Sequence, residues 1–540
     1  MTRRPRGPWI ETTLLTAAVF GVLAVWSLTT PLYSTVDEPR HINSVLRLVE
    51  GGGWPEPKSA PILEAVDVGA RESARPLGET EVPGAARAPG EPAPTPDTPL
   101  APAERSSLAG VEGPPAGKVP KLDWMTQHPP GYYALLAGAA VVTDAHDWRW
   151  DHAVVLLRLL SAAMAAATVP FVMAAARMLT GRRSAALAGG AFVLAVPQWA
   201  NVHSLVTNDA LMSLLSVMLI FFGLRAALRP GTLLSSSLLG GLTLGLGLLT
   251  KGLMLLAVPV LALLLLVAGW RAGRSWRHRF WIPLAGGVVA FAVGGWWYVR
   301  NLLVFGTLQP SNYGSGQNAQ AHPDYSLGRY LEIAPRKLVD TFWGSVRPSL
   351  DLPPWLVVGA SLTTLLAILA AVILSRHRVA LLSTFLLPTL LGALIVYHGW
   401  ELYWNFAIIA GVQGRYLFSV TLAVALCVAT VWAAVLRARV AIVVLAVVAA
   451  LAMVVVPAGI WRFSQTRLWP AGWDAMLAQS AVGPGGFVTV LALAATALVA
   501  SAIALVVLSS AESGSREPDR APNHRADGAT ADPLAASTPY

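Results

Sequence analysis

Long apolar runs recur along almost the whole sequence, and they restrict what the chain can fold into more than any other feature. Most of these runs are close to the ~20 residues that an α-helix needs to cross the hydrocarbon core of a bilayer. Only 13% of the residues are charged, compared with about 25% in ordinary soluble domains. The sequence therefore predicts an all-α polytopic membrane protein. It excludes a soluble globular enzyme, a secreted disulfide scaffold and a nucleic-acid binder.

About twelve membrane-spanning helices are predicted from these runs. Their approximate ranges are 12–31, 153–177, 184–203, 209–228, 231–249, 252–270, 280–299, 354–374, 379–397, 416–435, 440–460 and 485–508. One more apolar stretch, residues 131–143, is too short to span a bilayer, so we expect it to lie in the membrane interface or to re-enter.

The basic residues predict the orientation of these helices, because cytoplasmic loops are enriched in Lys and Arg. With the N-terminus inside, every short inner loop is basic. The arginines concerned are Arg182, Arg183, Arg225, Arg229, Arg271, Arg274, Arg277, Arg279, Arg376, Arg378, Arg437 and Arg439. The formal net charge of +9 is thus dispersed among loops rather than gathered in a patch for nucleic acid. We expect a multi-pass protein of the plasma membrane with both termini in the cytoplasm, and long outer loops at 32–152, 300–353 and 461–484.

The predicted domain organisation is simple. Residues 1–508 form one membrane domain. Within its first outer loop, residues 55–120 are rich in Pro, Gly and Ala and are expected to be a disordered insertion. Residues 509–540 are expected to be a disordered cytoplasmic tail. The single cysteine, Cys427, excludes an intramolecular disulfide.

Polar residues gather at one level, the outer ends of the predicted spans, where burial of charge is costly and usually functional. Asp37, Glu38 and His41 follow the first span, and Lys251 lies in a tight apolar turn between two spans. Further candidates at the same level are His128, Asn208, Asp209, Tyr298, Arg300, Arg415 and Tyr416. Lys251 considered alone is equally well explained by snorkelling of its ammonium group to the headgroups. Two adjacent carboxylates at a helix end have no comparable structural explanation.

Acids and bases on one face of a membrane indicate a specific chemistry. A carboxylate serves as a general base, and Lys and Arg neutralise a phosphate carried by a lipid. This combination suits sugar transfer from a lipid-linked donor. Asp37 would deprotonate the acceptor hydroxyl, and Lys251 with Arg300 or Arg415 would hold the departing phosphate. The transition state would have oxocarbenium character.

Over roughly residues 12–420, the chain resembles the GT-C glycosyltransferases, in particular the branch of protein O-mannosyltransferases and bacterial aminoarabinose transferases. The matching segments, in chain order, are Asp37-Glu38 with His41, His128-Pro-Pro-Gly-Tyr-Tyr133, Arg158-Leu-Leu-Ser161, Thr207-Asn-Asp209, Thr250-Lys-Gly252, Trp297-Tyr-Val-Arg-Asn301 and Gly414-Arg-Tyr416.

The resemblance implies two interfacial helices in the first outer loop, a catalytic acid at Asp37 and a second acid at Asp209. It also implies a polyprenyl-phosphate sugar donor and a glycan, lipid or protein acceptor. Family members often have Lys where this chain has His128. Many members need no metal, and we expect no cofactor here; the alternative is a divalent ion held between Asp37 and Asp209, as in oligosaccharyltransferase relatives.

Two other functions were weighed against an inverting glycosyltransferase. A transporter or flippase of a lipid-linked or polar solute should show internal repeats and broken helices near the midplane, whereas the polar residues here lie at helix ends and no repeat is evident. A structural scaffold leaves the placement of Asp37, Glu38 and Lys251 unexplained.

Overall fold

The architecture is described from a computed structural model. It describes residues 9–34, 37–57, 59–75, 98–111, 122–310, 326–346, 350–406, 411–435 and 472–514, together with the single positions 409, 446, 447, 450, 453 and 469. These residues are almost entirely helical. The strands among them are the two-residue pair β1 (Ser345–Val346) and β2 (Leu350–Asp351), which is antiparallel.

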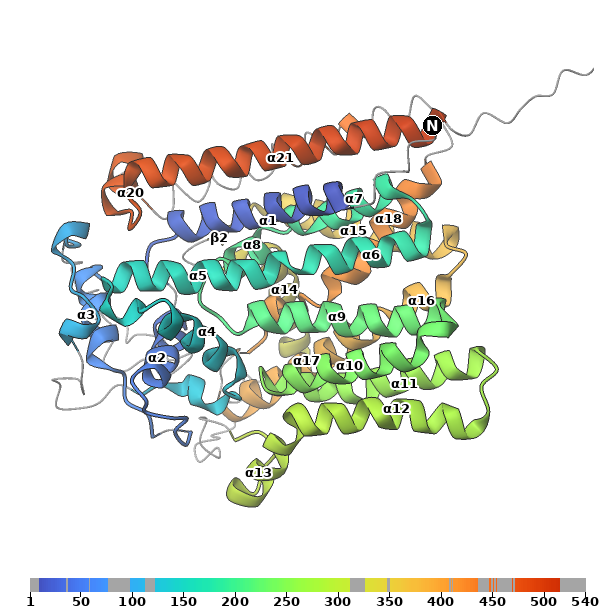
Figure 1. The fold of residues 1–540 in the computed structure, drawn as a ribbon, viewed down its shortest axis with the longest axis horizontal. Coiled ribbons are helices and arrows are strands. Elements are labelled where there is room, and N and C mark those ends of the chain that lie inside the picture. Colours follow the sequence, from blue (N-terminus) through green and yellow to red (C-terminus); the bar gives the residue numbers. More distant parts are fainter. Residues whose placement is uncertain are drawn as a thin grey trace, which may run out of the picture.

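Within this part of the chain, nine helical segments are long and apolar enough to cross a membrane. Several are composed of consecutive helices. They are α1 (Trp9–Thr29), α5 with α6 (Trp150–Ala166, Thr168–Thr180), α9 (Asp209–Leu228), η6 with α10 (Pro230–Thr232, Leu233–Leu248), η7 with α11 (Gly252–Leu256, Ala257–Arg271), α12 with η8 and α13 (Trp276–Ala290, Phe291–Gly295, Trp296–Phe305), α15 (Pro354–Leu374), α16 with α17 (Arg378–Ser383, Leu386–Phe406) and α21 (Gly483–Gly514). The helices lie side by side as a bundle (Figure 1).

A further pair of helices is long and apolar enough for a tenth span only when its two members are taken together, and the pair is bent. The segment α7 with η5 (Arg183–Gly190, Ala191–Ala195) meets α8 (Pro197–His203) at 74°. Pro197 begins α8, and a proline lacks the amide hydrogen that would continue the preceding helix. The polytopic, all-α class predicted from the sequence is thus confirmed.

One of the twelve predicted spans is shorter in the structure, and another falls largely outside the described residues. The span at 416–435 is the shorter helix α18 (Val420–Val435), because residues Gly414–Leu417 form the 3-10 turn η9. Most of the span at 440–460 lies outside the described residues.

The segment between α1 and α5 forms a cap at one end of the bundle, opposite the N-terminus (Figure 1). It contains α2 (Glu38–Val49), α3 (Glu64–Glu72), the 3-10 turns η1 (Pro102–Glu104), η2 (Ala109–Val111), η3 (Trp124–Gln127) and η4 (Ala145–Asp147), and α4 (Gly131–Val142). Helix α4 has 12 residues, which agrees with the prediction that this stretch does not span. The cap has a hydrophobic core of its own, formed by side chains such as Ile42, Val45, Val66 and Leu136.

Part of the expected disordered insertion at 55–120 is folded, so that prediction was wrong for residues 59–75 and 98–111. Ile62, Val66 and Ala70 are buried in the core of the cap. The Glu72 carboxylate accepts hydrogen bonds from Ser106 Oγ at 2.5 Å and from Trp150 Nε1 at 2.7 Å. The average composition of the segment concealed this short apolar face. Residues 76–97 and 112–121 lie outside the described part of the chain.

The remaining described helices are α14 (Leu327–Trp343) and α20 (Trp473–Gln479). Helix α21 ends at Gly514, slightly beyond the predicted domain boundary at 508, and the predicted tail after Gly514 is not described.

Candidate active site

Two carboxylates and two cations from four separate segments meet at the junction of the cap and the bundle. Asp37 Oδ2 accepts a hydrogen bond from Arg415 Nη2 at 2.9 Å, and Arg415 Nε lies 3.7 Å from Asp209 Oδ2. Asp209 Oδ1 in turn pairs with Lys251 Nζ at 2.5 Å. We call Asp37, Arg415, Asp209 and Lys251 the acid–cation chain. The structure thus brings together four of the side chains that the sequence singled out.

Tyr416 completes this arrangement. Its ring centre lies 4.8 Å from Lys251 Nζ and 5.2 Å from the guanidinium carbon of Arg415, distances at which a cation is attracted by the face of a ring. The Tyr416 hydroxyl also accepts a long hydrogen bond, 3.4 Å, from Arg415 Nη2. Tyr416 therefore holds both cations on one side.

The four residues of the acid–cation chain differ in how far their side chains are exposed. The side chains of Asp209 and Lys251 are only 4% and 8% exposed, whereas those of Asp37 and Arg415 are 29% and 20% exposed. Asp209 also begins α9, where the helix dipole stabilises a negative charge. Asp37 is therefore the more accessible of the two carboxylates, and Asp209 is the one that lies within ion-pair distance of both cations.

The Asp37 carboxylate is held in its ionised form. Burial by itself would raise its pKa, but the charges of Arg415 and Arg40 and the hydrogen bond from Arg415 outweigh burial, so that the pKa lies below its ordinary value. Asp37 thus carries a negative charge at neutral pH.

Three side-chain nitrogen atoms in or near the acid–cation chain are buried without a hydrogen-bond partner among the described residues. They are Arg415 Nε, Asn208 Nδ2 and His128 Nδ1. Asn208 is next to Asp209 in sequence, and His128 is close enough to Lys251 for that charge to act on it. Buried polar groups are hydrogen-bonded as a rule, so three unpaired ones around one cluster of charges indicate a place for a polar ligand.

Glycines at the predicted motifs permit the close contacts that position the cations. A Cβ at Gly414 would lie 2.3 Å from the backbone nitrogen of Phe342 in α14, and a Cβ at Gly252 would lie 2.0 Å from Gln309 Oε1. Gly131, which begins α4, donates a backbone hydrogen bond of 2.7 Å to Leu249, two residues before Lys251. These contacts seat η9, and the turn that carries Lys251, against α14 and the cap.

The two predicted site histidines, His41 and His128, lie beside the acid–cation chain. His41 Nδ1 forms a hydrogen bond of 2.9 Å with the Tyr133 hydroxyl, and the two rings are stacked. Burial lowers the pKa of His41 to about 4, and burial together with the charge of Lys251 lowers the pKa of His128 to about 3. Both imidazoles are therefore neutral at physiological pH and add no cation to the site.

Glu38, although adjacent to Asp37, has entirely different surroundings. Its two carboxylate oxygens pair with Arg158 Nε at 2.7 Å and Nη2 at 2.6 Å, and both side chains are at most 1% exposed. Arg158 also donates to the backbone carbonyls at the end of α1, those of Ser27, Thr30 and Pro31. Glu38 thus fixes the beginning of α2 to α1 and α5 and does not face the acid–cation chain.

Two other predicted site residues, Arg300 and Tyr298, are not part of the acid–cation chain. Arg300 packs over the rings of Trp297 and Phe305 and, with Trp54 and Gln127, lines a separate small groove. The hydroxyl of Tyr298 donates to the carbonyl of Leu248 at 2.9 Å and holds α13 to α10. The structure therefore joins Arg415, rather than Arg300, to Lys251.

The sequence analysis did not assign a role to Arg158, Tyr132 or Tyr133. Tyr132 bonds Ser161 Oγ at 2.7 Å, so that the resemblance motifs at 128–133 and 158–161 contact each other. An arginine inside an apolar run was a detectable signal, because such a charge must find a partner. The described residues contain no group of three or more His, Cys, Asp or Glu side chains placed to hold a metal ion.

Comparison with known proteins identifies the family. Residues 20–424 match the model of the predicted membrane protein family DUF2142. The chain belongs to this family. The matched range of DUF2142 includes all four residues of the acid–cation chain. No curated protein matches the sequence.

Two solved structures show a distant likeness. ArnT from Cupriavidus metallidurans, solved bound to undecaprenyl phosphate, is 16% identical with a TM-score of 0.45, over 93% of this chain and 77% of that one. The apo oligosaccharyltransferase of Archaeoglobus fulgidus is 12% identical with a TM-score of 0.38, over 92% of this chain and 56% of that one. Likenesses of this size do not establish an activity.

Proposed function

We propose that this protein is a membrane glycosyltransferase that moves a sugar from a polyprenyl-phosphate donor to a hydroxyl acceptor, with inversion at the anomeric carbon. The observation that carries the proposal is the acid–cation chain, in which an accessible carboxylate adjoins two cations in a largely buried setting. A purely structural ion pair would not need Asp37, which keeps nearly a third of its surface exposed while its charge is stabilised by Arg415.

Asp37 acts as the general base in this proposal. It takes the proton of the acceptor hydroxyl while that oxygen forms a bond to the anomeric carbon of the donor sugar. The bond from the anomeric carbon to the phosphate oxygen breaks, and the polyprenyl phosphate departs with the electron pair. Of the two carboxylates, Asp37 is the one suited to act as the base, because it is ionised at neutral pH and more exposed than Asp209.

The departing phosphate is held by donors that the resting protein leaves unused. Lys251 has three N–H groups, of which one points to Asp209, and Arg415 Nε is buried without a hydrogen-bond partner among the described residues. Arg415 provides paired donors for phosphate oxygens and Lys251 a compact charge. Asn208 Nδ2 and His128 are placed for further polar contacts to the donor.

Glu38 is a positioning residue in this scheme. Its buried pair with Arg158 fixes the peptide next to Asp37, so that the base approaches Arg415 at a constant distance. The buried Glu38–Arg158 pair thus supports the alignment of Asp37 with Arg415, which the reaction requires to within a fraction of an ångström.

The residues present do not suit a divalent ion between the two acids. Asp37 and Asp209 are already countered by Arg415 and Lys251, and two fixed positive charges at this point would repel a cation. We propose that the two side-chain cations supply the charge stabilisation and that a chelator leaves the transfer rate unchanged.

The acceptor is a glycan, a lipid or a protein hydroxyl on the outer face of the plasma membrane, where the cap lies if the N-terminus is cytoplasmic. A transport function is the competing proposal, and it predicts movement of a solute without cleavage of a donor.

The direct test is to incubate the purified protein with a panel of polyprenyl-phosphate sugars and to measure loss of donor and release of polyprenyl phosphate. With the donor that is consumed, Asp37→Asn should reduce turnover by at least 100-fold, since the general base is removed while the shape is kept.

Asp147→Asn is the matched control, because Asp147 is an acid of the same outer loop with 65% of its side chain exposed, and it should keep full activity. Full activity of Asp37→Asn would exclude Asp37 as the base. If no donor is consumed and the protein instead moves a solute into vesicles, the glycosyltransferase proposal is overturned in favour of a transporter.

A further inference from the structure

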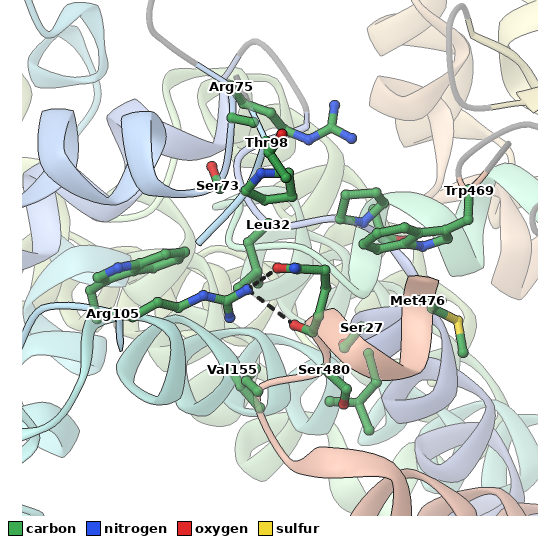
Figure 2. Close-up of a pocket in the computed structure, with 18 residues that line it drawn as sticks. Ser27, Leu32, Ser73, Arg75, Thr98, Arg105, Val155, Trp469, Met476 and Ser480 are labelled. Atoms are coloured by element: carbon green, nitrogen blue, oxygen red, sulfur yellow. Dashed lines mark hydrogen bonds between the residues drawn. The ribbon is translucent and has the colours of Figure 1, made fainter. Parts of the chain in front are cut away.

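A second cavity lies in the cap, away from the acid–cation chain. It has a volume of about 460 Å³, within the range of small-molecule sites. It is lined by the end of α1, the residues that follow α3, the beginning of α5, Trp469, and residues between Met476 and Ala481 (Figure 2). None of the residues in its lining belongs to the proposed transfer site.

One wall separates this cavity from the acid–cation chain. Thr30 and Pro31 line the cavity, and their carbonyl oxygens accept hydrogen bonds of 2.7 Å and 3.1 Å from Arg158. On its other side Arg158 pairs with Glu38, the neighbour of Asp37. The cavity and the acid–cation chain are therefore formed by different residues, and the hydrogen-bonded segment of Thr30, Pro31 and Arg158 separates them.

The cavity carries an excess of positive charge among the described residues. Arg105, whose side chain is 3% exposed, and Arg149 share a single carboxylate, that of Asp151, at 2.8 Å each. Arg75 lines the same cavity and forms no side-chain hydrogen bond or ion pair with any residue that the structure describes. An arginine on a cavity wall without a counterion favours a carboxylate or phosphate, which its planar guanidinium binds through paired donors.

Hydroxyl groups without partners add a polar character. Thr30 Oγ1 and Ser480 Oγ are buried, in residues 2% and 7% exposed, and neither has a hydrogen-bond partner within the described part of the chain. Figure 2 shows Ser480 below Arg105, whose guanidinium reaches into the cavity and is fixed by two bonds to Gln479. Such groups match the hydroxyls of a sugar or polyol, and they are costly to bury unless a ligand pairs with them.

The rest of the lining is apolar and includes Leu32, Met476 and Trp469. The Trp469 ring is held in place by a hydrogen bond of 2.6 Å from its Nε1 to the Thr29 carbonyl. A fixed aromatic ring with aliphatic neighbours suits the apolar face of a sugar ring, whereas a free inorganic anion would gain nothing from it.

We propose that this cavity is a second binding site, for a sugar or polyol that bears a phosphate or carboxylate group. Arg75 binds the anionic group, Arg105 supports it, and Thr30 and Ser480 bind hydroxyls. The site is independent of the proposed transfer reaction, since none of its residues touches the acid–cation chain.

The test measures binding to the full-length protein in detergent by calorimetry. Glucose 6-phosphate and glucuronate are the soluble anionic probes, and glucose is the neutral one. Vesicles of phosphatidylinositol, compared with phosphatidylcholine, present a phosphorylated polyol as a lipid headgroup. We expect an anionic probe to bind and glucose to bind at least tenfold more weakly. Binding of the soluble probes identifies a soluble ligand, and binding of phosphatidylinositol alone identifies a headgroup; both support the site.

Arg75→Gln should weaken binding of the anionic probe at least tenfold, about 1.4 kcal/mol. Thr30→Val, which keeps the shape and removes the unpaired hydroxyl, should weaken it as well. Arg71→Gln, which replaces an exposed arginine near the end of α3 that pairs with Glu64, is the control and should bind normally. Asp209→Leu combined with Lys251→Met, which removes both partners of a buried pair, should also bind normally, which separates this site from the donor site. Equal affinities of wild type and Arg75→Gln, or no binding of any anionic probe, would overturn the proposal.

Discussion

Asp37 and Glu38 are neighbours in sequence and have opposite environments in the structure. Glu38 is completely enclosed and doubly bonded to Arg158, while Asp37 is partly exposed and bonded to a single arginine nitrogen, Arg415 Nη2. Sequence alone could indicate that this acidic pair matters, but not which acid does what, because the difference arises from a contact with a residue 120 positions away. The different surroundings of the two acids, on which their proposed roles rest, are a result of the fold.

This difference predicts opposite phenotypes for two similar substitutions. Glu38→Gln should lower the free energy of unfolding by about 3–5 kcal/mol, because it leaves Arg158 as an uncompensated buried charge. Asp37→Asn should leave stability nearly unchanged. Thermal unfolding in detergent measures both. Glu332→Gln, at a site where the carboxylate is 68% exposed, is the control for loss of a surface charge. Equal stabilities of the two variants would contradict the assignment.

The pair of Asp209 and Lys251 can be removed as a unit to separate folding from function. Either single substitution leaves a buried charge, whereas replacing both partners of a buried pair by apolar residues is often neutral for stability. We expect Asp209→Leu combined with Lys251→Met to unfold near the wild-type temperature and to bind the donor at least tenfold more weakly. Unchanged donor affinity in a folded double variant would show that Lys251 serves only the structure.

At the scale of elements, the sequence motifs correspond to the contacts that place the cap on the bundle. The segments at 128–133, 158–161 and 250–252 were singled out from the sequence. In the structure the first contacts the second through Tyr132 and Ser161, and its Gly131 donates to Leu249, the residue before the third. The boundaries of α1, α9 and α15 were predictable from apolar runs. The folding of residues 59–75 was not, since the short apolar face of α3 packs against segments that are distant in the sequence, such as α5. Arg300 was grouped with Lys251 because both lie at helix ends, a criterion that does not give distance.

The close approach of η9 to α14 gives a prediction that involves no charge. In Gly414→Ala the new methyl group would overlap the backbone of Phe342 and Leu338, at 2.3 Å and 2.6 Å, so that η9 must move and carry Arg415 with it. A displacement of about 1 Å at a catalytic group costs roughly 100-fold in rate. The turnover number of the purified variant measures this effect. Gly359→Ala, where nothing lies within 4 Å of the added atom, is the control, and equal rates for both variants would contradict the proposed role of Arg415.

At the scale of the whole molecule, the two ends of the bundle are built differently. One end carries the cap. At the other, Arg183 pairs with Glu11 of α1 at 2.7 Å, and Glu512 of α21 accepts a hydrogen bond from Ser184 at 2.6 Å. The first and last described helices are thus joined through α7. The sequence predicted which end carries each basic loop, but it could not predict this contact between residues more than 320 positions apart.

The predicted orientation can be tested because the single cysteine, Cys427, is completely buried. Asp147→Cys, in the cap, should react with a membrane-impermeant maleimide added to intact cells. Ser275→Cys, at an exposed position in the loop between α11 and α12, should react only after the membrane is opened. The wild-type chain is the control for background labelling. The opposite pattern would place the proposed site in the cytoplasm and exclude the outward-facing reaction.

The pairing of Glu38 with Arg158 has a consequence for how this protein can diversify. Asp37 is one peptide bond from a residue fixed to the membrane helices, so its position does not depend on the outer part of the cap. The segments around α3, η1 and η2 contribute no member of the acid–cation chain. If Asp37 is the proton acceptor that we propose, insertions and exchanges there would change which molecules are admitted while this group stays in place, so that new acceptor preferences could evolve without rebuilding the chemistry.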